Sequence, residues 1–426
     1  MKRGCGGAGR TPESDGDLRP RAGMDRRTAF LTHLAPTSPE PIGIEVDRAE
    51  GWYLHATDGR RYLDLLSGIG VANIGHTHPE VVAAVAEQNR RHHHVMVYGE
   101  YVQEAPARYA EELAAVLPRS LNSVYFVNSG AEAVEGALKL ARRATGRAKF
   151  VAFEGAYHGD TLGALSVAGN PLYQDPFRPL VGPVEVLPFG DGDALSAIDT
   201  ATAAVIVEPI QGEGGVRIPP DGFLAAVRAR CDAAGALLLF DEVLTGFGRT
   251  GALYAFEHWD TVPDVLIHAK ALGGGFPLGA FIADRRLMEV FTHDPPLGHV
   301  TTFGGHPVSC AAGRAALSVL LRDGLSARAA RVGDRFTRAL RERLGGHPSI
   351  REVRGMGLLL GLELAGAAVT TRFVERCRDR GVLVGWTLHH DHIVRLAPPL
   401  TVAEDVLDEA VEILADALET RFSTGS

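Results

Sequence analysis

Apolar residues along the chain fall into short unbroken runs that alternate with segments of helical spacing. Residues 236–240 and 265–269 are two such runs, and each ends abruptly at charged residues or glycine. A continuous apolar run of about five residues is typical of a strand buried on both faces of a sheet. A helix is expected over residues 221–234, just before the first run. This pattern predicts an open α/β sheet, in which ligands lie at the carboxyl ends of the strands.

Other patterned segments extend this picture over the whole chain. Alternating apolar and polar residues around Asp58-Gly59 predict a β-hairpin. We expect further helices over 79–91, 104–116, 132–143 and 402–422, and further strands over 124–127, 148–153, 203–208, 350–354, 357–364, 382–385 and 392–396. The expected organisation is a disordered tail at 1–26, an N-terminal segment at 27–75 that joins the small domain, a large domain at 76–305 and a C-terminal small domain at 306–426.

Length and composition narrow the class of protein. The chain has 426 residues, enough for two or more domains, and its 46% hydrophobic and 22% charged residues are ordinary for a soluble globular protein. A net charge of −9 argues against nucleic-acid binding, and no apolar run approaches the roughly 18 residues of a membrane span. Four scattered cysteines without a CxxC pair fit reduced thiols. We therefore expect a cytoplasmic protein without nucleic-acid or membrane partners.

The most informative chemistry follows the two apolar runs. The first run leads into Asp241, and the second leads into Lys270 and three glycines. If both strands end at one edge of the sheet, the acid and the amine meet in one crevice. Pyridoxal phosphate needs such a pair, because a lysine binds it covalently and an acid keeps its pyridine nitrogen protonated. The alternative for an isolated acid and lysine is a partly buried ion pair.

The sequence segments around these residues resemble those of a known family. DEVLTGFGRTG at 241–251 and the lysine before ALGGGFPLGA resemble the class III (ω-amino acid type) aminotransferases of fold type I, and the likeness runs from about 51 to 400. The resemblance implies a large domain with a mostly parallel sheet flanked by helices, plus a smaller α+β domain. It also implies pyridoxal phosphate on Lys270, a homodimer with shared active sites, and transfer of a terminal amino group from an amino acid or amine to a 2-oxo acid such as 2-oxoglutarate or pyruvate.

A second site motif opens the predicted helix after residue 127. A strand leads into Ser129, Gly130 and Ala131, and a helical segment follows. Backbone N–H groups at a helix start, beside a glycine that permits close approach, form a site for a phosphate dianion. We assign these three residues to the cofactor phosphate. An ordinary serine-capped helix is the alternative.

The resemblance gives roles to further residues around the cofactor. Tyr157 is expected to stack on the pyridine ring, and Val243 to pack on the opposite face. Glu208 is expected in the hydrogen-bond network around Asp241, and His158 is either a supporting residue of the cofactor site or structural. Thr302 is expected to reach the phosphate of the neighbouring subunit, with a helix cap as the alternative.

Three residues are candidates for binding substrate. Arg395 occupies the family's position for the α-carboxylate, which a guanidinium can hold with two hydrogen bonds. Glu213 resembles the family's gate acid, which pairs with a mobile arginine when no α-carboxylate is bound. Tyr98 either lines the substrate site or packs at a domain boundary. Two departures from ornithine- and acetylornithine-type members, Asp160 in place of Arg and Leu244 in place of Gln, point instead towards amine-type members.

Other functions stay open at this point. The same cofactor apparatus serves racemases and 1,2-aminomutases, and a non-catalytic pyridoxal-phosphate-binding protein is a further alternative. The run His92-His93-His94 lacks a carboxylate or cysteine at ligand spacing, so we predict no metal site.

Overall fold

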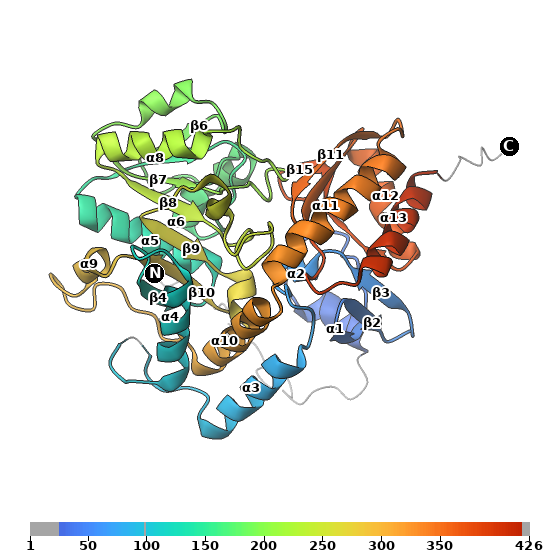
Figure 1. Cartoon of the computed structure of the whole chain (residues 1–426), viewed down its shortest axis with the longest axis horizontal. Coiled ribbons are helices and arrows are strands. Elements are labelled where there is room, and N and C mark those ends of the chain that lie inside the picture. Colours follow the sequence, from blue (N-terminus) through green and yellow to red (C-terminus); the bar gives the residue numbers. More distant parts are fainter. Residues whose placement is uncertain (1–24, 98, 420–426) are drawn as a thin grey trace, which may run out of the picture.

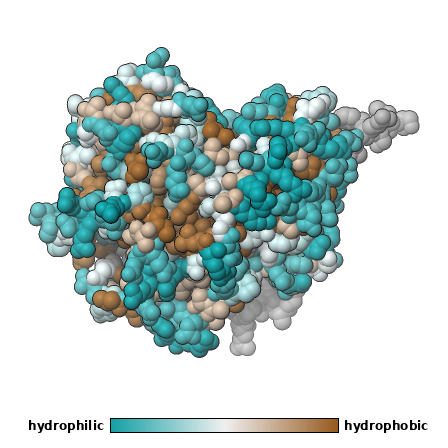
Figure 2. Space-filling model, in the orientation of Figure 1, coloured by the Kyte–Doolittle hydropathy of each residue, from teal (hydrophilic) through white to brown (hydrophobic). Residues whose placement is uncertain are grey.

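The computed structural model describes residues 25–97 and 99–419 of the chain. Figure 1 shows two lobes, a larger one built around a long sheet and a smaller one that gathers the N-terminal strands and the C-terminal elements. Figure 2 shows a notch between the lobes, with apolar residues gathered near the middle of this face and hydrophilic residues over its rims. Tyr98 lies outside the described residues, so its predicted role is untested.

A seven-stranded sheet forms the centre of the larger lobe, in the order β4-β10-β9-β8-β7-β5-β6. Its strands are β4 (Ser123–Val127), β5 (Lys149–Phe153), β6 (Val184–Leu187), β7 (Thr202–Val207), β8 (Leu237–Asp241), β9 (Val265–His268) and β10 (Gly279–Ala283). β10 runs antiparallel to both of its neighbours, and the other pairs are parallel. β7 and β9 are buried along their whole length, as expected for strands covered on both faces. The predicted mostly parallel sheet is confirmed.

Helices that follow the strands cover this sheet. The amphipathic helix α5 (Gly130–Thr145) contacts five strands with its apolar side, and α8 (Phe223–Ala234) packs on β7 and β8. Short turns join α5 to β5 and α8 to β8. Strands β8 and β9 are parallel neighbours, so their carboxyl ends lie side by side at one edge of the sheet.

A three-helix layer supports the turn that carries Lys270. The layer consists of α3 (Pro79–Arg91), α4 (Glu104–Val116) and α10 (Pro307–Arg322), and α10 packs against the short helix η4 (Lys270–Gly273). Gly313 of α10 lies so close that a Cβ there would overlap the Leu272 carbonyl oxygen. Tyr109 of α4 donates its hydroxyl hydrogen to the same oxygen at 2.6 Å. Helix α10 is therefore seated directly on the back of η4.

Two four-stranded sheets occupy the smaller lobe. One has the order β1-β2-β3-β13 and the other β11-β12-β15-β14. The strands are β1 (Val46–Glu50), β2 (Tyr53–Ala56), β3 (Arg61–Asp64), β11 (Ile350–Met356), β12 (Leu359–Leu364), β13 (Val382–Leu383), β14 (Gly385–Thr387) and β15 (His390–Leu396). The helices α11 (Leu325–Leu344), α12 (Ala367–Asp379) and α13 (Glu404–Glu419) accompany them. The predicted hairpin around Asp58-Gly59 is confirmed as β2–β3.

Two expectations about this lobe were wrong. The single strand predicted over 382–385 is divided, because the chain leaves one sheet after β13 and enters the other at β14. No helix was expected before residue 79, yet α1 (Arg26–His33) is present, and Asp25 caps it by accepting the Thr28 N–H at 2.8 Å. The tail predicted at 1–26 lies almost wholly outside the described residues and stays a prediction. Helix α1 buries none of its residues, so periodicity gave no sign of it.

Within the described residues, no helix is both long and apolar enough to cross a membrane. The same part of the chain holds no group of three histidine, cysteine or acidic residues arranged to bind a metal ion.

Candidate active site

A cavity of about 660 Å³ opens at the carboxyl ends of β8 and β9. Ten of the residues predicted for the cofactor or substrate line it, namely Ser129, Gly130, Ala131, Tyr157, His158, Glu208, Glu213, Asp241, Val243 and Lys270. They lie at or after the ends of five different strands, β4, β5, β7, β8 and β9, so the fold is what brings them together. The predicted meeting of Asp241 and Lys270 in one crevice is confirmed.

Lys270 is held in an unusual backbone conformation. It follows the end of β9 after one intervening residue, Ala269, and has a φ of 46°, in the left-handed region that non-glycine residues seldom adopt. Such strain persists only where the surrounding structure imposes it, and it concentrates at functional sites. Burial and the nearby positive charge of Arg395 lower the pKa of the Lys270 ammonium below its usual value. A larger share of this amine is therefore neutral and able to accept a proton.

Asp241 is buried and fixed at both carboxylate oxygens. Its Oδ1 accepts the Val243 N–H at 3.0 Å, and its Oδ2 lies 2.7 Å from His158 Nδ1. The side chain of His158 is itself fully buried, and its Nε2 has no hydrogen-bond partner in the described part of the chain. Asp241 is thus held as an oriented charge at the base of the cavity.

Glu208 supports the same region from the end of β7. Its Oε1 accepts the Tyr157 N–H at 3.0 Å, and its Oε2 accepts the Gly212 N–H at 2.9 Å. Burial raises the pKa of Glu208 to about 7, with Asp241 adding to the rise and His158 opposing it. Glu208 therefore anchors the loop that presents Tyr157.

The two residues predicted to flank the cofactor ring are both at the cavity. Tyr157 and Val243 both line it, and the Tyr157 hydroxyl is fixed by donating to Asp160 Oδ2 at 2.8 Å. A Cβ at Gly130 would lie 3.1 Å from Val243 Cγ1, tighter than an ordinary contact. Glycine at this position lets the start of α5 approach Val243 closely.

The start of α5 closes one end of the cavity. Ser129 is the N-cap, and its Oγ accepts the Glu132 N–H at 3.1 Å, which leaves its own O–H able to donate. The serine-capped helix that we considered as an alternative is present, and it is compatible with anion binding. Asn128, which the sequence reasoning missed, lines the cavity beside it and donates to Thr301 Oγ1 at 3.1 Å.

Arg395 and Glu213 form a buried ion pair at the substrate side. Their side chains are 4% and 11% exposed, and Arg395 Nη1 donates to Glu213 Oε1. Burial alone would raise the pKa of Glu213, but the charges of Arg395 and Lys270 and the Leu388 N–H together hold it below its usual value. Glu213 lines the cavity and pairs with Arg395, which does not line it, and its role as a gate acid stays a prediction.

Two of the predicted residues that the structure describes, Thr302 and Arg395, are absent from the lining of this cavity, although Arg395 is bound to the lining residue Glu213. Thr302 is exposed and absent from the lining, so within a single chain it does not touch the site. Several lining residues were not predicted, among them Val71, Thr161 and Phe276. The Gly-Gly-Gly sequence after Lys270 was the available signal for Phe276, because glycines at 273–275 turn the chain back across the cavity.

The residues present fit pyridoxal phosphate. A primary amine, a buried acid, an aromatic ring and a helix start suited to a phosphate converge on one space. The unpartnered His158 Nε2 marks a polar position that the protein itself leaves unsatisfied. Each feature matches one part of the cofactor.

Comparison with known proteins agrees with this geometry. The family model described as Aminotransferase class-III matches residues 34–418. Acetylornithine aminotransferase of Methanopyrus kandleri is 47% identical over 87% of this chain and 92% of its own length, and putrescine aminotransferase of Pectobacterium atrosepticum is 42% identical over 84% and 79%. The solved ornithine aminotransferase of Toxoplasma gondii, which has partial occupancy of PLP at its active site, superposes with a TM-score of 0.86 at 31% identity and covers 92% of both chains.

Proposed function

The chain belongs to the class-III aminotransferases and transfers amino groups to 2-oxo acids, and from this premise we propose that Lys270 carries pyridoxal phosphate and that the donor is a terminal amine. The observation that carries the cofactor proposal is the convergence of Lys270 and the buried Asp241 on one cavity. The family membership favours transamination over the racemase, aminomutase and non-catalytic alternatives.

Each residue of the cavity has a task in this reaction. Bound pyridoxal phosphate supplies an electron-withdrawing ring beside the reacting carbon. Lys270 Nζ holds the cofactor and then accepts and returns the proton of the substrate carbon, which its lowered pKa favours. Asp241 would hold the pyridine nitrogen, and Tyr157 and Val243 would flank the ring. Ser129 and the N–H groups at the start of α5 would hold the phosphate.

The Arg395–Glu213 pair explains how one cavity accepts two kinds of substrate. A donor that reacts at a terminal amine has no carboxylate on the reacting carbon, and the closed pair then leaves no unpaired charge. A 2-oxo acid carries a carboxylate beside the reacting carbon, and Arg395 can bind it when it separates from Glu213. The two substrates therefore use two arrangements of the same arginine.

Two residues support an amine as the donor. Asp160 holds a carboxylate at the cavity lining where it cannot bind a donor carboxylate, and its charge favours a cation. Leu244 is buried and offers an apolar wall. The named relatives act on acetylornithine or putrescine, and their similar identities to this chain do not choose between the two.

We propose a cytoplasmic homodimer with shared sites. Thr302 is exposed in a segment that also exposes Leu297, Val300 and Phe303, at 56%, 49% and 52%. An exposed apolar group of this kind favours burial against another chain. In such a dimer Thr302 would donate to the partner's cofactor phosphate. The buried free cysteines Cys231, Cys310 and Cys377 support a reducing compartment.

Covalent trapping tests the proposal directly. Purified protein should be yellow, and borohydride reduction followed by peptide mapping should find pyridoxyl on Lys270. A label on another lysine, or none after addition of pyridoxal phosphate, would end the cofactor assignment. A panel of terminal amines and α-amino acids, each with 2-oxoglutarate and pyruvate, should show turnover that requires the 2-oxo acid. Turnover without an oxo acid would instead support an isomerase.

A further inference from the structure

The hairpin formed by β14 and β15 ends in a two-residue turn, Leu388 and His389, that lies beside the gate. Thr387 and His390 pair across the base of the turn. Arg395 belongs to β15, so the hairpin that presents the arginine also presents the turn.

The turn holds the gate acid through its backbone. The Leu388 N–H donates to Glu213 Oε2 at 2.7 Å, while Arg395 binds the other carboxylate oxygen, Oε1. A second backbone bond joins the His389 N–H to the Glu213 carbonyl at 3.3 Å. Glu213 therefore has two separate anchors, of which only one is the arginine.

Residues of the larger lobe hold the Leu388-His389 turn in place. Tyr173 donates its hydroxyl hydrogen to the Leu388 carbonyl at 2.7 Å, and His389 Nδ1 lies 3.1 Å from the Gly155 carbonyl oxygen. The ring of His389 lies between Tyr173, at 5.4 Å, and Tyr157, at 6.1 Å between centroids. The Leu388 N–H is thus a positioned donor.

We propose that the Leu388 N–H is a positioning group that keeps Glu213 in place when Arg395 leaves it for a substrate carboxylate. This inference rests on the proposed two-substrate use of Arg395. When Arg395 departs, Glu213 would otherwise remain as a buried carboxylate without a donor, which is costly. If the Leu388 N–H stays bound, it lowers the cost of burying the Glu213 carboxylate. This hydrogen bond matters more once Arg395 has left, because the carboxylate then keeps the Leu388 N–H as its partner.

A proline at position 388 tests the donor with little change in the turn. Neither Leu388 nor His389 has a positive φ, and proline fits the first position of such a turn after an extended residue. Leu388→Pro removes the N–H, whereas Leu388→Ala keeps it and truncates a side chain that is 40% exposed. The two variants therefore separate the backbone donor from the side chain.

The expected result is a change in one KM and not in the other. Leu388→Pro should raise the KM for the 2-oxo acid by about tenfold, as expected for a lost hydrogen bond to a charged group, and leave the KM for the terminal amine nearly unchanged. Leu388→Ala should keep the wild-type ratio of the two KM values. Equal changes in both values, or a proline variant with the alanine variant's ratio, would overturn the proposal.

A second variant covers the case in which the proline protein does not fold. Tyr173→Phe releases the Leu388 carbonyl and should shift the same ratio in the same direction by about twofold. An unchanged ratio in a Tyr173→Phe protein of wild-type thermal midpoint would also overturn the inference. If the wild type itself shows no 2-oxo acid dependence or no cofactor on Lys270, the proposed function fails rather than the role of Leu388.

Discussion

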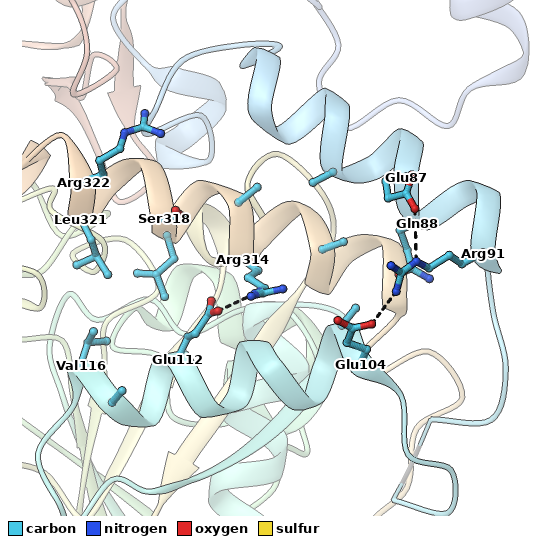
Figure 3. A pocket seen from close by; sticks show the side chains of 16 residues that line it. Glu87, Gln88, Arg91, Glu104, Glu112, Val116, Arg314, Ser318, Leu321 and Arg322 are labelled. Carbon is cyan, nitrogen blue, oxygen red and sulfur yellow. Dashed lines mark hydrogen bonds and ion pairs between the residues drawn. The ribbon is translucent and has the colours of Figure 1, made fainter.

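Two cavities of similar size in this protein differ in the burial of their charged side chains. The groove between α3, α4 and α10 has a volume of about 710 Å³, and the cavity at Lys270 about 660 Å³. Figure 3 shows two ion pairs between side chains of the groove, Arg314 with Glu112 and Arg91 with Glu104. These four side chains are between 37% and 62% exposed.

In the cavity, by contrast, charges from distant parts of the chain are buried together. Asp241 is 4% exposed, and Arg395 and Glu213 are 4% and 11% exposed in their side chains. Exposed pairs interact weakly through water, whereas buried groups alter one another's pKa values and affinities strongly. The comparison teaches that buried convergent charge, and not volume, distinguishes the cavity that we propose as the active site.

The largest expected effect on activity is that of removing the Lys270 amine, which we propose as the reactive group. Lys270→Ala should lower kcat by on the order of 10⁴-fold, because the variant loses both the cofactor linkage and the proton carrier. Steady-state transamination with a terminal amine and a 2-oxo acid measures it. Arg91→Ala in the groove is the control and should keep the wild-type kcat. Substantial turnover by Lys270→Ala would show that the strained lysine is not the reactive group.

The next largest effect should come from neutralising the buried acid. Asp241→Asn keeps the shape of the side chain and removes its charge, and we expect kcat to fall by about 10²- to 10³-fold. Absorbance of the bound cofactor, read beside kcat, separates weakened binding from slower chemistry. Glu112→Gln makes the same chemical change in the groove. Similar losses in both variants would contradict the distinction between the cavities.

Loss of the gate arginine should separate the two substrates. Arg395→Ala should raise the KM for the 2-oxo acid by about 100-fold and affect the terminal amine far less, because only the oxo acid uses the guanidinium. Arg395→Lys keeps the charge but cannot form two parallel hydrogen bonds, so its KM for the 2-oxo acid should lie between those of the wild type and Arg395→Ala. Equal KM changes for both substrates would remove the carboxylate role.

Glu208 should make stability depend on pH. Burial raises its pKa in the folded chain to about 7 from a usual value of 4.5, so the folded state binds the proton more tightly than the unfolded state does. Its contribution to the free energy of unfolding is therefore greatest at low pH and declines as pH rises towards 7. Urea denaturation at fixed protein concentration should show wild type losing on the order of 2 kcal/mol relative to Glu208→Gln between about pH 5 and pH 8. A pH-independent difference would contradict the shift.

The smallest effect should lie in the groove. Glu112→Gln breaks the pair with Arg314, whose two side chains are 37% and 42% exposed, and should change the free energy of unfolding by less than about 1 kcal/mol. Urea denaturation of the two proteins measures the difference. A loss of several kcal/mol would mean that the groove charges are not screened as their exposure indicates.

The sequence predicted those parts of the site that lie on regular elements. Buried strands ending at Asp241 and Lys270, and the helix start at Ser129, follow from local patterns, since a buried strand and a capped helix each have a local signature. The Arg395–Glu213 pair joins residues 182 positions apart and was expected only through the family resemblance. The Leu388 N–H left no trace in the sequence, because every residue except proline carries that donor. Helix α1 was not predicted, because it buries no apolar face and so lacks the periodic pattern of a packed helix.

The contact between Gly313 and the Leu272 carbonyl offers a way to change the position of Lys270 by a substitution outside the cavity. Because helix α10 has no room for a methyl group there, exchange of Gly313 for alanine would press on the Leu272 carbonyl of η4 and on the Tyr109 ring, and through η4 it would act on the position of Lys270 without replacing any residue of the cavity lining. Catalytic tuning in this enzyme is thus open to substitutions in a helix that no substrate touches, and a search for improved variants confined to the cavity walls would overlook them.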